Sequence, residues 1–196
     1  MAQRTITATF ADSISSANPT VNQATFAYGD PTASTDVRRG SLKFDFSSIP
    51  FGSTITAVVL QIYNVSNDAS NNREVGIFRC KRAQTNAATW DTFDGSSNWG
   101  TAGASNTTSD IEAASIGTVT LTTGQAVEYF NITLTASKIQ EMFEGVFTNN
   151  GFILMANNIG TEADDRHEFD SESDSNPPKL VVTYLESVNQ SVFILQ

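Results

Sequence analysis

The strongest constraint on the fold is a pair of alternating segments joined by a turn. Residues 41–46 (SLKFDF) alternate apolar and polar side chains, the period of two that is typical of a half-buried strand. Pro50 fixes its own φ and Gly52 permits positive φ, so the residues between the segments predict a turn. Residues 54–63 (TITAVVLQIY) are apolar and β-branched, and they predict a second strand. Its predicted core positions are Ile55, Val58, Leu60 and Ile62.

The rest of the chain repeats this pattern of short strands between clusters of turn-forming residues. Further strands are predicted at 5–10, 24–28, 73–82, 118–121, 127–134, 151–156, 166–169 and 179–185. We expect 118–121 and 127–134 to form a hairpin, and the continuous apolar run 151–156 to be buried on both sides. One short helix is predicted within 135–147, because apolar residues there recur at helical spacing and Gly145 can end it. This pattern predicts an all-β fold, a single antiparallel, jelly-roll-like β-sandwich over residues 1–185.

Charge and composition exclude several classes of function. The chain has 21 acidic and 11 basic residues, a formal net charge of −10, so a phosphate backbone would be repelled and no nucleic-acid partner is expected. No apolar run is long enough to span a membrane, so no membrane partner is expected. The single cysteine, Cys80, cannot form an intramolecular disulfide and is predicted to lie in the core. The only histidine, His167, has no pattern of catalytic partners, and we predict that the protein is not an enzyme.

A long irregular region, residues 83–116, contains both tryptophans. Aromatic rings beside planar polar groups are what a carbohydrate site requires, so this loop is one candidate for sugar binding. The residues that could supply it are Trp90, Trp99, Phe93, Asp91 and Asn98. The alternative is that the tryptophans pack onto one end of the sandwich, since large aromatic side chains are usually buried.

Two other segments are candidates for binding. The acidic residues Asp164, Asp165 and Asp170 could hold a structural calcium ion, which prefers oxygen ligands; the alternative is a solvated acidic surface, which is the usual role of a run of like charges, and no other cofactor is expected. Residues 186–196 form a tail that ends in an apolar run. The tail either folds back on its own sheet or docks on a neighbouring subunit, by strand addition or by insertion into a groove. Its docking residues would be Val192, Phe193, Ile194 and Leu195.

Five segments in order resemble a known family of sandwich domains. They are RGSLKFDFSSIP at 39–50, TITAVVLQIY at 54–63, ATWD through WGTAGA at 88–104, NGFIL at 150–154 and FDSE through PKLVVTY at 169–184. Together they resemble the DNRLRE-type β-sandwich domains, which are related to alginate-binding carbohydrate modules and to disaggregatase-associated repeats. The resemblance implies one sandwich over nearly the whole chain. It assigns no sugar contact to a particular residue, because two tryptophans common in the family are absent here.

Two functions are compatible with these observations. We expect a non-catalytic sandwich displayed on an extracellular assembly, as a structural or decoration protein of a phage capsid or tail that could also bind glycans. The chain starts at Met1 with no secretion signal, and an apolar tail suits docking to a neighbour. Its partners would be other virion subunits, copies of itself in a homo-oligomer and a polysaccharide, at the virion surface or elsewhere outside the cell. The alternative is a free-standing carbohydrate-binding module of a polysaccharide-degrading system.

Overall fold

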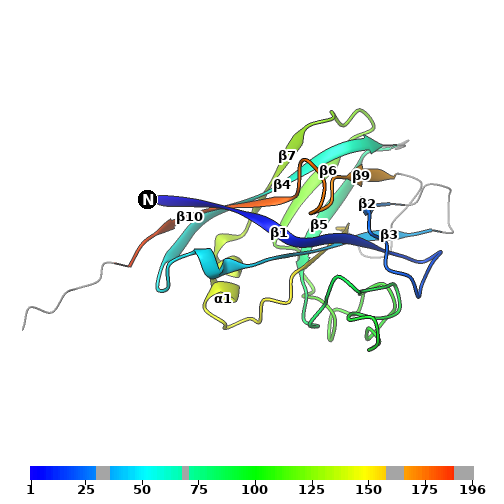
Figure 1. Cartoon of the computed structure of the whole chain (residues 1–196), viewed down its shortest axis with the longest axis horizontal. Coiled ribbons are helices and arrows are strands. Elements are labelled where there is room, and N and C mark those ends of the chain that lie inside the picture. Colours follow the sequence, from blue (N-terminus) through cyan, green and yellow to red (C-terminus); the bar gives the residue numbers. More distant parts are fainter. Residues whose placement is uncertain (30–35, 68–70, 158–165, 188–196) are drawn as a thin grey trace, which may run out of the picture.

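Two layers of antiparallel strands make up the molecule in the computed structural model, which describes residues 1–29, 36–67, 71–157 and 166–187 (Figure 1). The strands in these ranges form one continuous hydrogen-bonded sheet that folds over on itself, with a single α-helix. The strands are β1 (Ala2–Ser15), β2 (Phe26–Tyr28), β3 (Arg38–Phe44), β4 (Thr54–Asn67), β5 (Arg73–Arg79), β6 (Gly117–Leu121), β7 (Tyr129–Leu134), β8 (Phe152–Ala156), β9 (His167–Phe169) and β10 (Lys179–Leu185), and the helix is α1 (Ala136–Phe143). The predicted all-β sandwich with one short helix is confirmed.

Strand β1 joins the two layers. Its residues 2–7 pair with β10, and its residues 8–15 pair with β3. The register shifts between Ala8 and Phe10, and such a bulge lets a strand bend from one layer into the other. The first layer therefore has the order β7, β4, β10 and the first half of β1, and the second has the second half of β1, then β3, β8, β5 and β6. Strand β9 pairs with the C-terminal end of β4 and, along its other edge, with β2.

The main core lies between the layers and follows from the alternation in the sequence. Leu42 and Phe44 of β3 face Leu60 and Ile62 of β4 within it, and all four side chains are fully buried. Burying a side chain of this size contributes about 1.5–3 kcal/mol, so strands with this pattern are stable only when they are packed together. All four core positions predicted for residues 54–63 are buried.

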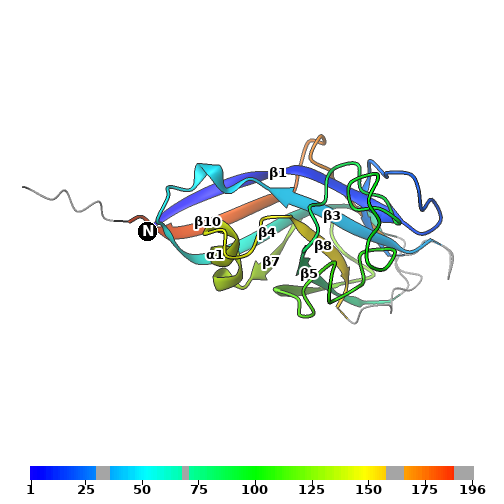
Figure 2. The same ribbon diagram turned by 90° about the horizontal axis from the view of Figure 1, so that it is seen from below.

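A second core lies on the outer side of the β3, β8 and β5 layer. The loop of residues 81–116 folds across this surface (Figure 2) and contributes Trp99 and Ile111 to it. They pack against Phe78 of β5 and against alternate residues of β8. Strand β8 thus has the main core on one face and this loop on the other, and all five of its residues are buried, as predicted.

The predicted hairpin is wrong. Strand β6 pairs with β5 and β7 pairs with β4, so the chain crosses from one layer to the other between residues 121 and 129. A pattern of alternation shows that both segments are strands, but the choice of neighbour depends on which layer has a free edge. The helix lies within the predicted range 135–147 and ends at Phe143, shortly before Gly145, which adopts a φ of +77°. No helix in the described ranges has the length and apolar character needed to cross a membrane.

Candidate functional site

The structure buries the second tryptophan of the predicted sugar-binding loop. Trp99 is 5% exposed, and its indole nitrogen donates a hydrogen bond to the Thr89 carbonyl over 3.0 Å. Its ring contacts Phe93 edge-to-face at 5.7 Å between centroids. A sugar needs an open aromatic face, so this burial counts against Trp99 as a stacking surface. The packing resembles the alternative expected from the sequence, except that the loop covers the outer face of one layer rather than an end of the sandwich.

Trp90 lies at the edge of the same loop and is half-buried. The guanidinium of Arg39 lies 5.0 Å from its ring centroid, and a Cβ atom at Gly103 would lie 2.6 Å from the ring. Gly103 also has a φ of +78°, so a residue without a side chain is needed there. The Trp90 ring is therefore packed between Arg39 and Gly103, and part of it remains exposed to solvent.

The polar residues predicted for this loop serve mainly to shape it. The Asp91 amide donates to the Pro19 carbonyl over 3.0 Å, and its carbonyl accepts from the Trp99 amide over 3.0 Å. Asn98 is exposed and forms a β-bridge with Thr92. The structure thus brings all five predicted residues into one loop, with the aromatic rings directed largely at the second core.

The predicted calcium residues are only partly described. Asp164 and Asp165 lie outside the described residues. The Asp170 carboxylate accepts hydrogen bonds from the backbone amide and the side-chain amide of Asn176, over 3.1 and 3.0 Å, and so closes a turn. Within the described ranges, no three His, Cys, Asp or Glu side chains are grouped so that they could hold a metal ion. Val192, Phe193, Ile194 and Leu195 also lie outside the described residues, so docking by the tail stays a prediction.

The outer surface of the other layer, which we call the open face, presents rows of polar side chains. Thr7, Lys179, Gln61 and Asn131 lie opposite one another across β1, β10, β4 and β7. Residues paired in this way share one face of a sheet. The neighbouring row consists of Thr5, Val181, Val59 and Thr133, so two valines lie among the polar side chains, and a Tyr63–Tyr129 pair follows at the other end. All of these side chains are exposed or half-buried.

Contacts on the open face place two aromatic rings beside amide and ammonium groups. The rings of Tyr63 and Tyr129 meet edge-to-face at 5.2 Å, and the Lys179 ammonium lies 4.6 Å from the Tyr129 ring centroid. Nε2 of Gln61 donates to Oδ1 of Asn131 over 3.0 Å. The Tyr129 hydroxyl donates to the Pro177 carbonyl over 3.1 Å, which fixes the ring on the surface.

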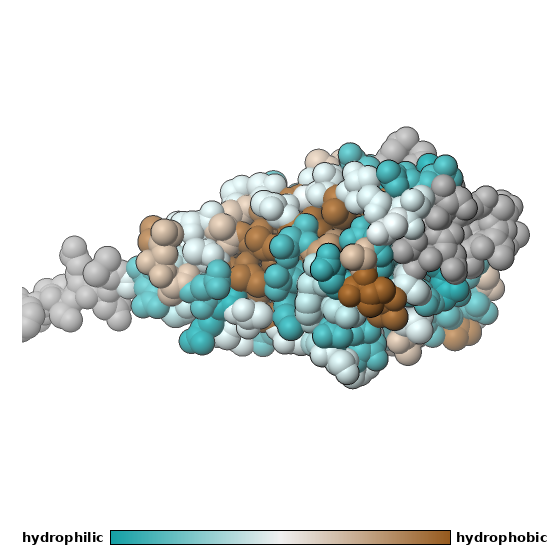
Figure 3. Space-filling view, turned by 90° about the horizontal axis from the view of Figure 1, so that it is seen from above, coloured by the Kyte–Doolittle hydropathy of each residue, from teal (hydrophilic) through white to brown (hydrophobic). Residues whose placement is uncertain are grey.

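This arrangement suits a ligand that has both apolar faces and hydroxyl groups. Figure 3 shows the molecule from above, the side away from the loop of residues 81–116, with apolar groups in the middle surrounded by hydrophilic and weakly polar ones. Partly exposed tyrosine rings offer apolar area, while the amides and threonine hydroxyls can both donate and accept hydrogen bonds. Lys179 is the charged residue in these rows, so the open face lacks the negative charge of the whole chain.

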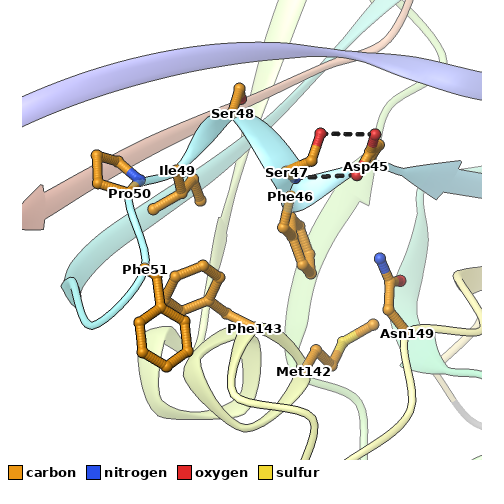
Figure 4. Close-up of a pocket in the computed structure, with 10 residues that line it drawn as sticks. All are labelled: Asp45, Phe46, Ser47, Ser48, Ile49, Pro50, Phe51, Met142, Phe143 and Asn149. Atoms are coloured by element: carbon orange, nitrogen blue, oxygen red, sulfur yellow. Dashed lines mark hydrogen bonds between the residues drawn. The ribbon is translucent and has the colours of Figure 1, made fainter.

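A third surface lies between residues 45–51 and α1, in a groove of about 580 Å³ (Figure 4). The Asp45 carboxylate accepts hydrogen bonds from the Ser47 amide and hydroxyl over 2.9 and 2.8 Å, and so fixes the turn. These bonds hold the pKa of Asp45 below its usual value. We call this surface the α1 groove; six of its ten lining residues are apolar, and the other four are Asp45, Ser47, Ser48 and Asn149.

Comparison with known protein families settles the class of this protein. The model of carbohydrate-binding module family 96 matches residues 7–184. The chain belongs to carbohydrate-binding module family 96. The match runs from β1 to β10 and includes both layers, the long loop and the open face. A search of curated proteins gave no match.

Membership of family 96 favours one of the two functions expected from the sequence. It supports the alternative expectation, a carbohydrate-binding module, and such modules are a non-catalytic class, in agreement with the expected lack of enzymatic activity. Nothing in the comparisons or in the described structure supports the expected place in a phage virion. The resemblance to the DNRLRE-type domains is not confirmed. The match does support the broader expectation of a β-sandwich of the carbohydrate-binding kind.

Sequence reasoning missed the open face of this family 96 module. The signal was present as alternation, since Gln61 and Tyr63 alternate with buried residues of β4, and Tyr129 and Asn131 alternate with Phe130 and Ile132 of β7. These residues form one surface only because β7 pairs with β4. The sequence analysis instead predicted that β7 pairs with β6 in a hairpin.

Proposed function

We propose that this protein is a non-catalytic module that binds a polysaccharide on its open face. The observation that carries the proposal is the family 96 match over residues 7–184, because it places nearly the whole chain in a class of carbohydrate-binding modules. The choice of surface rests on the contrast between the layers. The loop of residues 81–116 covers the outer face of one layer, while the other presents two tyrosines and rows of polar side chains.

The chemistry of the open face suggests how a sugar chain is held. The rings of Tyr63 and Tyr129 would pack against the C–H faces of sugar rings, since such contacts bury apolar area without leaving a polar group unpaired. Gln61 and Asn131 would exchange hydrogen bonds with hydroxyl groups, and Lys179 would favour ligands that carry a carboxylate or sulfate. In this role the module keeps a polysaccharide-degrading system close to its substrate outside the cell.

The test is a measurement of affinity for a panel of soluble polysaccharides that includes neutral glucans, xylans and mannans, and acidic polyuronates. Native protein is expected to be retarded in gels that contain at least one of them. Tyr63→Ala and Tyr129→Ala should each weaken binding about tenfold, equivalent to about 1.4 kcal/mol, with unchanged far-ultraviolet circular dichroism. Lys179→Gln should weaken binding of acidic polysaccharides more than that of neutral ones.

The matched control is Trp90→Ala, which removes an aromatic ring from the loop of residues 81–116. This variant is expected to keep the native affinity within about twofold. Loss of affinity in Trp90→Ala, with native affinity in the two tyrosine variants, would move the site to the loop. A native protein that binds no polysaccharide of the panel would overturn the proposed function itself.

A further inference from the structure

The α1 groove leaves two phenylalanine side chains, Phe51 and Phe143, fully or partly exposed. Phe46, Ile49 and Met142 are buried in its walls, and Phe51 and Phe143 lie at one end of it (Figure 4). The Phe51 side chain is 97% exposed. Large apolar side chains left in water in this way commonly mark a surface on which another segment packs.

An occupant of the α1 groove would gain stability from this surface. Burial of one phenylalanine side chain is worth about 1.5–3 kcal/mol, and Phe51 and Phe143 both have area left to bury. The polar groups at the other end are only partly engaged: Asp45 accepts hydrogen bonds from Ser47, and Nδ2 of Asn149 donates one to the Phe44 carbonyl over 2.8 Å, while the buried Oδ1 of Asn149 has no hydrogen-bond partner in the described structure. The end of the groove at Phe51 and Phe143 therefore fits an apolar side chain.

The course of the chain brings a suitable segment to this place. The described chain ends at Ser187, whose hydroxyl donates to the Phe51 carbonyl over 3.4 Å. Residues 188–196 (VNQSVFILQ) follow, without a charged residue and with four apolar residues in a row. The five residues from Ser187 to Val192 can span up to ~17 Å at about 3.3 Å each, which is enough to enter a groove that begins beside Ser187.

We propose that residues 188–196 dock in the α1 groove of the same chain, with Phe193 and Ile194 packed against Phe51 and Phe143. The observations behind this are the two phenylalanines at one end of the groove, the almost full exposure of Phe51, and the contact that places Ser187 beside it. A segment tethered this close has an effective concentration in the millimolar range, so the intramolecular contact forms before one with a second molecule. The proposal concerns a surface other than the open face and does not depend on sugar binding.

Hydrogen exchange on the full chain tests the docking directly. The comparison is between native protein, Phe193→Asp, which places a charge in the apolar segment, and Ser191→Asp, which adds the same charge next to it. In Phe193→Asp, amides of α1 and of residues 46–51 are expected to exchange about fivefold faster or more, because an occupied groove holds the helix in place. The control Ser191→Asp should exchange like native protein, and so should β6 and β7 in both variants.

A double-mutant cycle identifies the partner of the segment. Phe51→Ala should lower the melting temperature of the native chain and leave that of Phe193→Asp unchanged, since a nearly fully exposed ring without a partner contributes little. Equal effects of Phe51→Ala in both backgrounds would overturn the proposal. Protection that rises with protein concentration, together with a dimer mass by light scattering, would overturn the intramolecular assignment in favour of a second copy.

Discussion

At the scale of single residues, Asp12 is a carboxyl group whose ionisation opposes folding. It lies on β1 with its side chain 7% exposed, near Glu172, which accepts a hydrogen bond from the Ala11 amide over 2.8 Å. Burial, together with the charge of Glu172, raises the pKa of Asp12 to about 6 from an ordinary value of 3.8. The folded state therefore holds this proton more tightly than the unfolded chain does.

The raised pKa fixes the sign of a pH effect at Asp12. Below about pH 4 Asp12 is protonated in both the folded and the unfolded state, and its ionisation does not reduce the stability of the fold. As the pH rises from there through about 6, the unfolded chain releases the proton more readily than the folded state, so the free energy of unfolding falls. Asp12→Asn should therefore add about 1–3 kcal/mol more stability at pH 7.5 than at pH 4. Urea unfolding of both proteins at several pH values measures the difference, and an effect independent of pH would contradict the interpretation.

Cys80 shows the same influence of burial on a thiol. Its side chain is fully buried, and burial raises the pKa of the thiol to about 12. The thiolate is the reactive form, so this cysteine is a packing residue of the second core, as the sequence predicts.

At the scale of elements, the loop of residues 81–116 is organised by one buried carboxylate. The Asp110 side chain is fully buried and accepts hydrogen bonds from the amides of Gly100 and Thr101, over 2.7 and 3.0 Å, and from the Ser109 hydroxyl over 3.0 Å. The Arg82 guanidinium lies 3.5 Å from it. These bonds replace the regular pairing that a long loop lacks.

Asp110→Asn is expected to loosen this loop. The new amide would direct a donor at backbone N–H groups, and leaving such buried groups unpaired costs about 2–4 kcal/mol. The control is Asp94→Asn, in an exposed turn of the same loop, where the loss should be much smaller. Thermal melts and the rate of proteolysis within residues 81–116 measure both effects; equal losses in the two variants would contradict the assigned role of Asp110.

At the scale of the whole molecule, Arg79 connects parts of the chain that are far apart in sequence. Its guanidinium, 1% exposed, donates to both carboxylate oxygens of Glu112, to Glu141 and to the Lys138 carbonyl, each over 2.7 Å. It also lies 4.0 Å from the Phe147 ring centroid. One side chain of β5 thus fastens the long loop and α1 to the sandwich, and its hydrogen bond keeps the pKa of Glu112 below the usual range.

Arg79→Lys should destabilise the whole protein by about 2–4 kcal/mol, because an ammonium group cannot form the same planar set of hydrogen bonds with two carboxylates. The control is Arg4→Lys at an exposed position of β1, where a change below about 0.5 kcal/mol is expected. Chemical denaturation measures the free energy of unfolding of each variant. A loss at Arg79 no larger than that at Arg4 would show that the contacts of Arg79 do not stabilise the fold.

The sequence by itself determined the class of fold and the positions that form its core. Alternation in residues 54–63 identified their buried side chains, and the apolar run 151–156 identified a strand covered on both faces, because burial of apolar area depends on local pattern. The same reasoning placed the helix and its end at Gly145. These features require no knowledge of which strand lies next to which.

The tertiary structure alone decided which strands are neighbours, and with them the candidate site. Tyr63 and Tyr129 meet only because β7 pairs with β4 instead of β6, and Trp99 is buried only because its loop folds across β8. The physical reason is that strand pairing depends on free edges and on backbone hydrogen bonds, which are nearly the same for every sequence. The alternating pattern therefore identifies what is buried in this protein, and the assembled sheet decides what remains exposed for a ligand.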